Sequence, residues 1–272
     1  MVAVPSGDAR ALAAALPNAN AIAHCIAGAA AQIQRNAATL YGLLATSNAR
    51  PRVVHLSSMT VYGSATGAVD ESCEPRADLG PYSQAHRAAE KVSAAAGAVI
   101  LRPAAEYGPT CGAWSGRIAR LLKARRLGDL GEFGDGWCNL VFIDDLASVF
   151  RWALREPGIE GKIFNVADPQ KITWNDYFTR YAIALGATPV RRIGPRRLKW
   201  ETRLAAPPLW AAGLLANTAR LRFLPIPPPI PPSMLRLCGQ AIDLSPALLD
   251  GIMRPTWTPL DKGLRQAAEA YG

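Results

Sequence analysis

Residues 53–63 of this chain read VVHLSSMTVYG. The stretch begins with an apolar run that has the pattern of a buried strand and ends on two serines. Similar short apolar runs recur along the chain, and the segments that separate them have the pattern of helices. The predicted strands are 21–25, 52–56, 98–101, 140–143 and 162–166, and the predicted helices are 29–46, 82–96 and 144–155. Apolar strands that alternate with helices are typical of a parallel sheet covered on both faces. The sequence therefore predicts an α/β fold.

The pattern changes after residue 173. Residues 173–186 have the pattern of an amphipathic helix with Thr173 as its N-cap, and 245–271 that of two short helices. We therefore expect two parts. A core domain would contain the sheet (1–105 plus 140–167), and a smaller, mostly helical lobe would contain the rest (106–139 plus 168–272).

Composition limits the classes of partner. The 272 residues are 50% hydrophobic and 19% charged, which is typical of a folded chain. The net charge of +9 is spread along the sequence, and its densest stretch, 191–199, lacks interleaved aromatic residues. We therefore expect no nucleic-acid partner.

Cysteine and histidine usage indicates a reducing compartment and no metal. The five cysteines are widely spaced without a CxxC motif, and the three histidines are not spaced as a ligand pair. The N-terminus lacks the pattern of a signal peptide. We therefore expect a cytoplasmic protein without a metal site.

The longest apolar stretch lies at 204–219. As a helix it would be about 24 Å long, shorter than the roughly 30 Å hydrocarbon core of a bilayer, and Pro207 and Pro208 interrupt it. We expect it to be packed against the protein. Contact of the wider apolar region, 204–237, with a membrane surface or a hydrophobic substrate is the alternative.

Several motifs in order carry a resemblance that covers almost the whole chain. They are 53–63 (VVHLSSMTVYG), 82–91 (YSQAHRAAEK), 101–109 (LRPAAEYGP), 133–147 (FGDGWCNLVFIDDLA), 161–167 (GKIFNVA) and 257–271 (WTPLDKGLRQAAEAY). Together they closely resemble the extended short-chain dehydrogenase/reductases, the NAD-dependent epimerase/dehydratase family. The resemblance implies a Rossmann-like parallel sheet and a C-terminal substrate lobe. It also implies NAD or NADP as cofactor and oxidoreduction or epimerisation of a small or nucleotide-linked hydroxyl substrate.

The resemblance also implies the catalytic residues. Ser58 matches the family's catalytic Ser/Thr, which hydrogen-bonds the reacting oxygen of the substrate. Tyr82 matches the tyrosine that moves a proton while a hydride moves to or from the nicotinamide. Because Ser58 follows a predicted strand, we expect it at the carboxyl edge of the sheet, where such folds bind ligands.

One position departs from the family pattern. The family has Tyr-x-x-x-Lys, whereas His86 follows Tyr82 here. The family lysine contacts the nicotinamide ribose and lowers the pKa of the tyrosine, and moving a phenol pKa from about 10 to about 7 corresponds to roughly 4 kcal/mol. Histidine is mostly neutral at pH 7. We therefore predict weakened or pH-shifted catalysis, with His86 as an imperfect replacement.

The remaining cofactor contacts are implied in the same way. The segment HCIAG at 24–28 resembles the strand end that passes under the cofactor, and Arg102 and Pro103 match the turn that approaches the nicotinamide. The predicted cofactor-binding residues are therefore Ala27, Gly28, Tyr82, His86, Arg102 and Pro103. His24 and His55 are expected to be buried in their strands rather than catalytic.

The family's glycine-rich pyrophosphate turn has no counterpart in this sequence. No Gly-x-x-Gly-x-x-Gly follows an early strand. Residues 1–5 resemble the third strand of the family sheet instead, which would leave strand 21–25 with a bare edge. Three interpretations stay open. The natural chain carries the turn upstream, the protein is a non-catalytic relative that acts as a binding or interaction protein, or a homo-oligomer or another chain supplies the missing edge.

Overall fold

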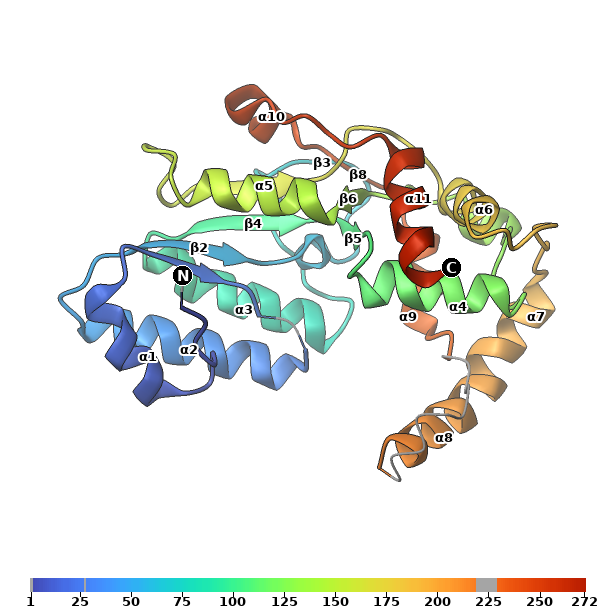
Figure 1. Cartoon of the computed structure of the whole chain (residues 1–272), viewed down its shortest axis with the longest axis horizontal. Helices are drawn as coiled ribbons and strands as arrows, with labels where there is room; N and C mark the ends of the chain where they lie inside the picture. The colour runs from blue at the N-terminus through green and yellow to red at the C-terminus, as the bar shows by residue number, and fades with distance from the viewer. Residues whose placement is uncertain (1, 27, 219–228) are drawn as a thin grey trace. The chain divides into compact units, whose positions relative to one another are not determined.

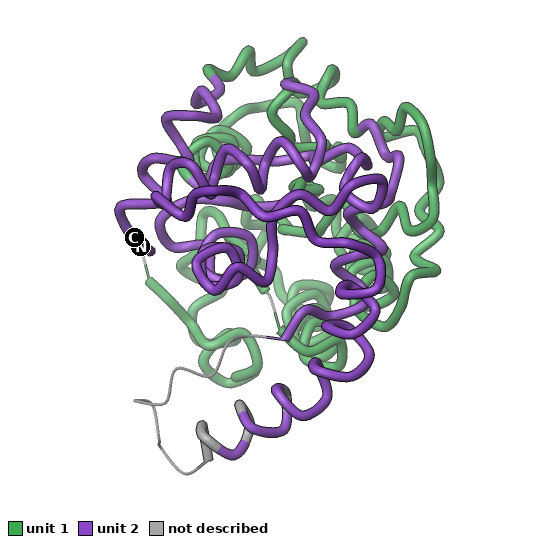
Figure 2. Tube along the Cα trace, turned by 90° about the vertical axis from the view of Figure 1, so that its right-hand side faces the viewer, with its two compact units in different colours: residues 1–104, 144–169, 244–256 green, residues 105–143, 170–243, 257–272 purple. Residues whose placement is uncertain are grey.

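The computed structural model describes residues 2–26, 28–218 and 229–272. The chain forms two compact units (Figure 2). Unit 1 comprises 1–104, 144–169 and 244–256, and unit 2 comprises 105–143, 170–243 and 257–272. The sequence had placed 244–256 in the C-terminal lobe, whereas here it packs with the sheet unit.

Unit 1 contains a parallel sheet and the helices that cover it. Its strands are β1 (Ala21–His24), β2 (Arg52–Leu56), β3 (Gly67–Val69), β4 (Val99–Pro103) and β7 (Ile163–Val166). Its helices are α1 (Ala9–Ala15), η1 (Leu16–Asn18), α2 (Ala30–Thr46), η2 (Met59–Tyr62), α3 (Pro81–Ala95), α5 (Ile143–Ala153) and α10 (Ala247–Met253).

The main sheet has the order β1-β2-β4-β7, and every neighbouring pair is parallel. Helices α2 and α3 lie on one side of this sheet and α5 lies on the other (Figure 1). Apolar residues of α2 and α3 form one core with Val53 of β2. On the other side, Trp152 of α5 contacts Phe164 of β7, with ring centroids 5.5 Å apart. The predicted Rossmann-like α/β fold is thus confirmed.

Two strand predictions need correction. Residues 2–5 form no strand, although the family resemblance had placed one at 1–5. A strand needs a partner for its backbone groups, and among the described residues β1 is the outermost strand of the sheet. The predicted strand at 140–143 exists as β6 (Leu140–Phe142), but it pairs with β5 (Ala105–Tyr107) in a separate two-stranded sheet.

A tight turn follows η2 and fixes the end of the motif at 53–63. Gly63 has φ +61°, and a Cβ there would lie 2.1 Å from Oδ1 of Asp78. Asp78 Oδ1 accepts a hydrogen bond from the main-chain N–H of Ser64 (2.8 Å). Only glycine allows both this backbone conformation and this close approach.

Unit 2 is mostly helical. Its strands are β5, β6 and β8 (Ile242–Leu244). Its helices are η3 (Gly112–Gly116), α4 (Arg117–Lys123), η4 (Gly131–Gly134), α6 (Trp174–Ala184), α7 (Pro195–Trp200), η5 (Glu201–Ala205), α8 (Ala206–Thr218), α9 (Pro232–Cys238) and α11 (Leu260–Tyr271).

Helix α6 is the centre of the unit 2 core. Its side chains Trp174, Tyr177, Phe178 and Tyr181 are all buried, and they pack with residues of α4 and α11. The predicted N-cap is present, because the Thr173 hydroxyl accepts from the N–H of Asp176 (3.1 Å) while Asp176 accepts from the N–H of Thr173 (2.9 Å). Within the described residues, no helix is both long and apolar enough to span a bilayer.

Candidate active site

The carboxyl ends of the parallel strands place the predicted site residues along one edge of the unit 1 sheet. His24, at the end of β1, is in register with His55 of β2, so the two strands end side by side. Ser58 is the second residue after the end of β2. Ligands of open α/β sheets bind at this edge, and the positions that follow the strands are therefore the candidate site.

Ser58 caps the short helix η2. Its Oγ accepts from the N–H of Thr60 (3.2 Å) and from the Thr60 hydroxyl (3.0 Å). A hydroxyl has one hydrogen to donate and two acceptor positions. Since both contacts use Ser58 Oγ as acceptor, its hydrogen remains to donate to a substrate oxygen, and the cap holds the side chain in place for that contact.

Tyr82 lies in the first turn of α3, next to Pro81. Its side chain is 44% exposed, which is unusual for an aromatic residue in a buried layer of helices. Ser83 orients this end of the helix, because its hydroxyl contacts the main-chain oxygens of Gly80 (2.9 Å) and Ala77 (3.1 Å). Helix α3 packs against η2. Tyr82 and Ser58 are therefore held on neighbouring elements.

His86 lies one turn after Tyr82 on the same face of α3. The two rings meet edge to face, with centroids 4.6 Å apart and an interplanar angle of 67°. The His86 side chain is buried, and burial lowers its pKa to about 4, although the Glu90 carboxylate opposes this shift. Its imidazole is consequently neutral at pH 7. The cation that the family lysine places beside the tyrosine is therefore not supplied by His86.

The predicted cofactor contacts lie at the same edge. Gly28 follows β1, is exposed and has φ +124°. Arg102 and Pro103 close β4 and are both buried. The Arg102 guanidinium is hydrogen-bonded to other side chains. We therefore predict that a cofactor contact at this position is made by its main chain. Ala27 lies outside the described residues.

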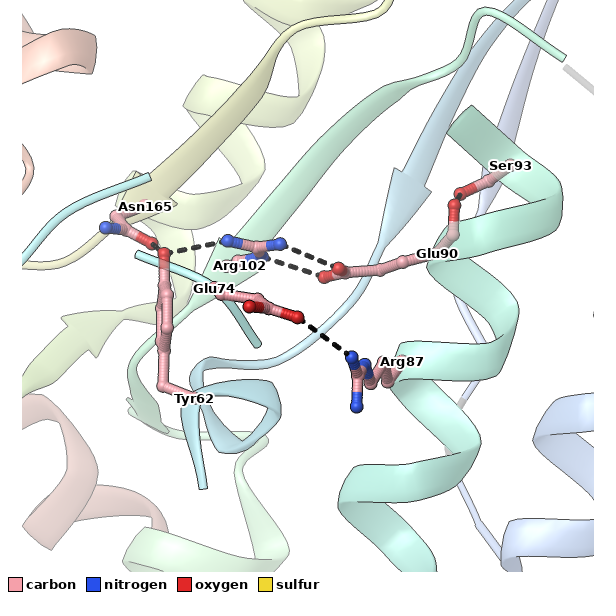
Figure 3. Close-up of polar contacts among 7 residues, drawn as sticks. All are labelled: Tyr62, Glu74, Arg87, Glu90, Ser93, Arg102 and Asn165. Atoms are coloured by element: carbon pink, nitrogen blue, oxygen red, sulfur yellow. Dashed lines mark hydrogen bonds and ion pairs between the residues drawn. The ribbon is translucent and has the colours of Figure 1, made fainter. Parts of the chain in front are cut away.

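A buried network connects α3, β4, η2 and β7 (Figure 3). Nε and Nη2 of Arg102 donate to the two carboxylate oxygens of Glu90 (2.9 and 2.8 Å). Nη1 of Arg102 donates to the Tyr62 hydroxyl (2.9 Å), and this hydroxyl donates to Oδ1 of Asn165 (2.7 Å). Both carboxylate oxygens and the hydroxyl are thus satisfied, as a buried charge pair requires.

The network fixes the helix that carries the candidate catalytic residues. Tyr82, His86 and Glu90 follow one another at intervals of one turn, so they share a face of α3. Two hydrogen bonds join Glu90 to Arg102 of β4, so an ion pair two turns after Tyr82 ties α3 to the sheet.

A second buried polar cluster lies beside α2. Nδ1 of His24 and Nδ1 of His55 are 2.8 Å apart, and the Tyr41 hydroxyl is 3.2 Å from Nδ1 of His55. Burial lowers the pKa of His24 to about 4 and that of His55 to about 3. Both side chains are buried, which confirms the expected position of these two histidines in their strands.

Sequence analysis missed Tyr62, Glu90 and Asn165. The signal was present in the charge pattern, because Arg102 interrupts an otherwise apolar strand and Glu90 falls on the buried face of α3. Charged residues at buried positions need partners, and these two are the partners of each other. Within the described residues, no group of three or more His, Cys, Asp or Glu side chains could hold a metal ion.

Known structures share this fold. At 13% identity, RMD from Pseudomonas aeruginosa, solved with NADPH, has a TM-score of 0.69 over 99% of this chain and 86% of its own. UDP-glucuronic acid 4-epimerase from Bacillus cereus, solved with NAD, has 16% identity and a TM-score of 0.70 over 96% and 76%. dTDP-glucose 4,6-dehydratase from Bacillus anthracis, also solved with NAD, has 15% identity and a TM-score of 0.71 over 99% and 78%.

Comparison at the sequence level gives the family. No curated protein matches the chain. The model of the NAD dependent epimerase/dehydratase family matches residues 8–167, which is more than half of the chain and includes Ser58, Tyr82 and His86. The order of the motifs, the Rossmann-like sheet and this match agree. The chain belongs to the NAD-dependent epimerase/dehydratase family.

Proposed function

We propose that the protein is an NAD(P)-dependent oxidoreductase or epimerase that acts on a hydroxyl or carbonyl group of a small or nucleotide-linked substrate. The observation that carries the proposal is the exposed Tyr82 phenol at the carboxyl edge of the sheet, held on an element that packs against the one capped by Ser58. A general acid–base must be both accessible and fixed, and Tyr82 is both.

The residues present fit the nicotinamide end of such a cofactor. Nδ1 and Nε2 of His86 are buried, and within the described part of the chain neither has a hydrogen-bond partner. Both nitrogens are enclosed by the protein itself, so in this arrangement a ribose hydroxyl does not reach them, and the fit at this end rests on the exposed Tyr82 phenol. The exposed Gly28 lies after β1, where a backbone without a side chain allows close approach of a ligand. For the pyrophosphate end, the described residues contain no strand followed by a glycine-rich turn.

Three side chains have distinct roles in the proposed chemistry. The bound nicotinamide would provide hydride transfer. Ser58 donates its hydroxyl hydrogen to the reacting oxygen, which orients and polarises the carbon–oxygen bond. Tyr82 takes the proton of a substrate hydroxyl, or returns it to a carbonyl. His86 contacts the Tyr82 ring but is neutral, so the tyrosinate is stabilised less than it is beside a lysine.

A second candidate function follows from that neutral histidine. A relative that has lost catalysis needs no cation beside Tyr82, and a chain of this kind would act as a binding or interaction protein. The buried, neutral His86 favours this alternative, whereas the exposed Tyr82 and the free donor hydrogen of Ser58 favour the enzyme.

Titration of the purified chain with NADH and with NADPH tests the proposal, followed by tryptophan fluorescence and calorimetry. We expect binding at micromolar strength, and then turnover of nucleotide-linked hydroxyl substrates that Tyr82→Phe abolishes without weakening cofactor binding. Binding with turnover that Tyr82→Phe leaves unchanged would contradict the assigned role of Tyr82. Absence of binding at millimolar cofactor would overturn the proposal and favour the binding protein.

A further inference from the structure

Helix α8 (Ala206–Thr218) has an unusual composition for its place in the molecule. Its sequence, APPLWAAGLLANT, contains no acidic, basic or histidine residue. Within unit 2 its main packing contact is with η5, the segment that directly precedes it. Figures 1 and 2 show that α8 extends away from α4 and α6 of the same unit.

A helix that is apolar on all sides is expected to be buried. The segment that ends in α8 nevertheless exposes large apolar side chains on its outer side: Leu204 is 66% exposed and Trp200 is 54% exposed. Within α8 itself, Leu215 is 69% exposed. Several exposed apolar side chains along a single helical segment indicate a surface that binds a partner protein or a membrane.

The preceding segment is basic on its outer side. Arg196, Lys199 and Arg203 are exposed in α7 and η5. The acidic residue of this segment, Glu201, is buried and forms an ion pair with Arg126. The outward charge of this segment is therefore positive, and it lies directly beside the apolar helix.

We propose that α7, η5 and α8 together form a contact with the surface of an anionic lipid bilayer. In this contact α8, which is apolar on all sides, is embedded among the acyl chains of one leaflet, and Arg196, Lys199 and Arg203 meet the lipid phosphates. The exposed Trp200 lies within the basic part, next to Lys199 and one turn before Leu204, and tryptophan is enriched at membrane interfaces. The contact is independent of the proposed catalysis, since it uses no residue of the candidate active site.

The length of α8 fits a surface contact. Its 13 residues correspond to about 20 Å of helix, which is short of the roughly 30 Å hydrocarbon core. Pro207 and Pro208 lie in its first turn, which continues directly from the π-helical turn η5, so the two N–H donors that proline lacks are missing at this junction and not in the rest of α8. The remainder of the helix can therefore stay intact while it is embedded in one leaflet.

A bilayer suits this segment better than a second copy of the chain. A symmetric contact would cover one side of a helix that is apolar all round, and it would bring two equally basic segments near one another. Lipid covers the helix on several sides, and its negative charge complements the three exposed cations.

Flotation of the full chain with lipid vesicles tests the proposal without any cofactor. The vesicles contain phosphatidylcholine alone or equal parts of phosphatidylcholine and phosphatidylglycerol. We expect binding to the anionic vesicles, a blue shift of tryptophan emission, and weaker binding to the neutral ones. Leu204→Glu with Leu215→Glu, and separately Arg196→Glu with Lys199→Glu and Arg203→Glu, should each lower the partition coefficient at least about tenfold.

Matched control variants test whether binding depends on this segment or only on the overall charge and hydrophobicity of the chain. Ile183→Glu replaces another exposed apolar residue of unit 2, 59% exposed on α6, and should bind as the wild type does. Lys91→Glu with Lys262→Glu and Arg265→Glu gives the same change in net charge at other exposed positions and should also bind normally. Circular dichroism of each variant verifies the fold.

Three results would overturn the proposal. The first is no binding of the full chain to anionic vesicles. The second is an equal loss of binding in the control variants, because nonspecific charge or hydrophobicity would then explain the binding. The third is a dimer in sedimentation velocity that Leu215→Glu dissociates while vesicles have no effect, because a second copy would then cover α8.

Discussion

The ring of His86 meets the ring of Tyr82 edge to face, at a centroid distance of 4.6 Å, on successive turns of α3. Tyr82 is exposed and His86 is buried, so the histidine supports the phenol from inside the protein. Its position corresponds to that of the family lysine, but burial keeps its pKa at about 4 and hence its ring uncharged. The candidate site thus has an exposed tyrosine and a buried, uncharged histidine one turn apart on α3.

Substitution of His86 by lysine should restore that charge. We expect His86→Lys to raise oxidoreductase activity at pH 7 by about a hundredfold, within the range of general acid–base effects, because a cation beside a phenol favours the phenolate. Steady-state rates of NAD(P)H formation or consumption measure the effect. Gln84→Lys adds the same charge at an exposed position of α3 and should have no effect. If both variants or neither raise the rate, the missing cation is not what limits activity.

Removal of the Ser58 hydroxyl should affect the reaction more than the fold. We expect Ser58→Ala to lower kcat by about a hundredfold or more, since one hydrogen-bond donor to the reacting oxygen is lost. The neighbouring Ser57→Ala is the control, because Ser57 Oγ is buried and, in the part of the chain that the structure describes, has no hydrogen-bond partner. Equal kcat values for the two variants would argue against the donor role of Ser58.

Breaking the buried pair Glu90–Arg102 should cost far more stability than breaking the exposed pair Glu74–Arg87, which Figure 3 shows nearby. Glu90→Gln leaves a buried guanidinium without its counter-charge, and we expect it to lower the free energy of unfolding by about 3–5 kcal/mol. Urea denaturation measures this quantity.

The exposed pair provides the control for that experiment. We expect Glu74→Gln to change the free energy of unfolding by less than about 1 kcal/mol, because its charges are solvated. The double variant Glu90→Leu with Arg102→Met removes both buried charges and should recover much of the loss. A loss from Glu74→Gln as large as that from Glu90→Gln would show that burial does not set the energy of the pair.

The three buried histidines should make the fold sensitive to mild acid. Burial lowers the pKa of His24 and of His86 to about 4 and that of His55 to about 3, whereas all three have pKa values near 6.5 in the unfolded chain. Between these values the unfolded state binds more protons, so stability is fully present above pH 6.5 and falls as the pH drops towards 4. The slope should reach about 4 kcal/mol per pH unit if all three contribute.

Urea denaturation at a series of pH values measures this slope. Because His86→Gln removes one of the three titrating groups, it should lower the slope by about a third. An unfolding free energy that stays constant between pH 6.5 and pH 4.5 would contradict the burial of neutral imidazoles.

The elements that the sequence could predict were those with a local pattern. Strand β2 has an apolar run, helices α2, α3 and α6 have helical periodicity, and α6 has its own cap, and the bounds of all four agree with the prediction to within about two residues. The pairing of β6 with β5 could not be read in this way, because an apolar run of four residues does not specify its partner.

The same limit applies to the candidate site. Ser58, Tyr82 and His86 were predicted because each lies in a motif with fixed spacing. The partner of Arg102 depends on which face of α3 meets β4, and the pKa of His86 depends on how deeply that face is buried. Both are properties of packing between segments that are distant in the sequence.

The interleaving of the two units along the chain has a consequence for biosynthesis. Unit 1 needs residues 244–256 and unit 2 needs residues 257–272, so neither unit is complete when residue 243 leaves the ribosome. When β7 has emerged and α10 has not, the apolar surface of the sheet is incompletely covered. Chaperone contact during translation should therefore last until these segments have emerged, and a stop codon shortly before residue 244 should leave both units unfinished.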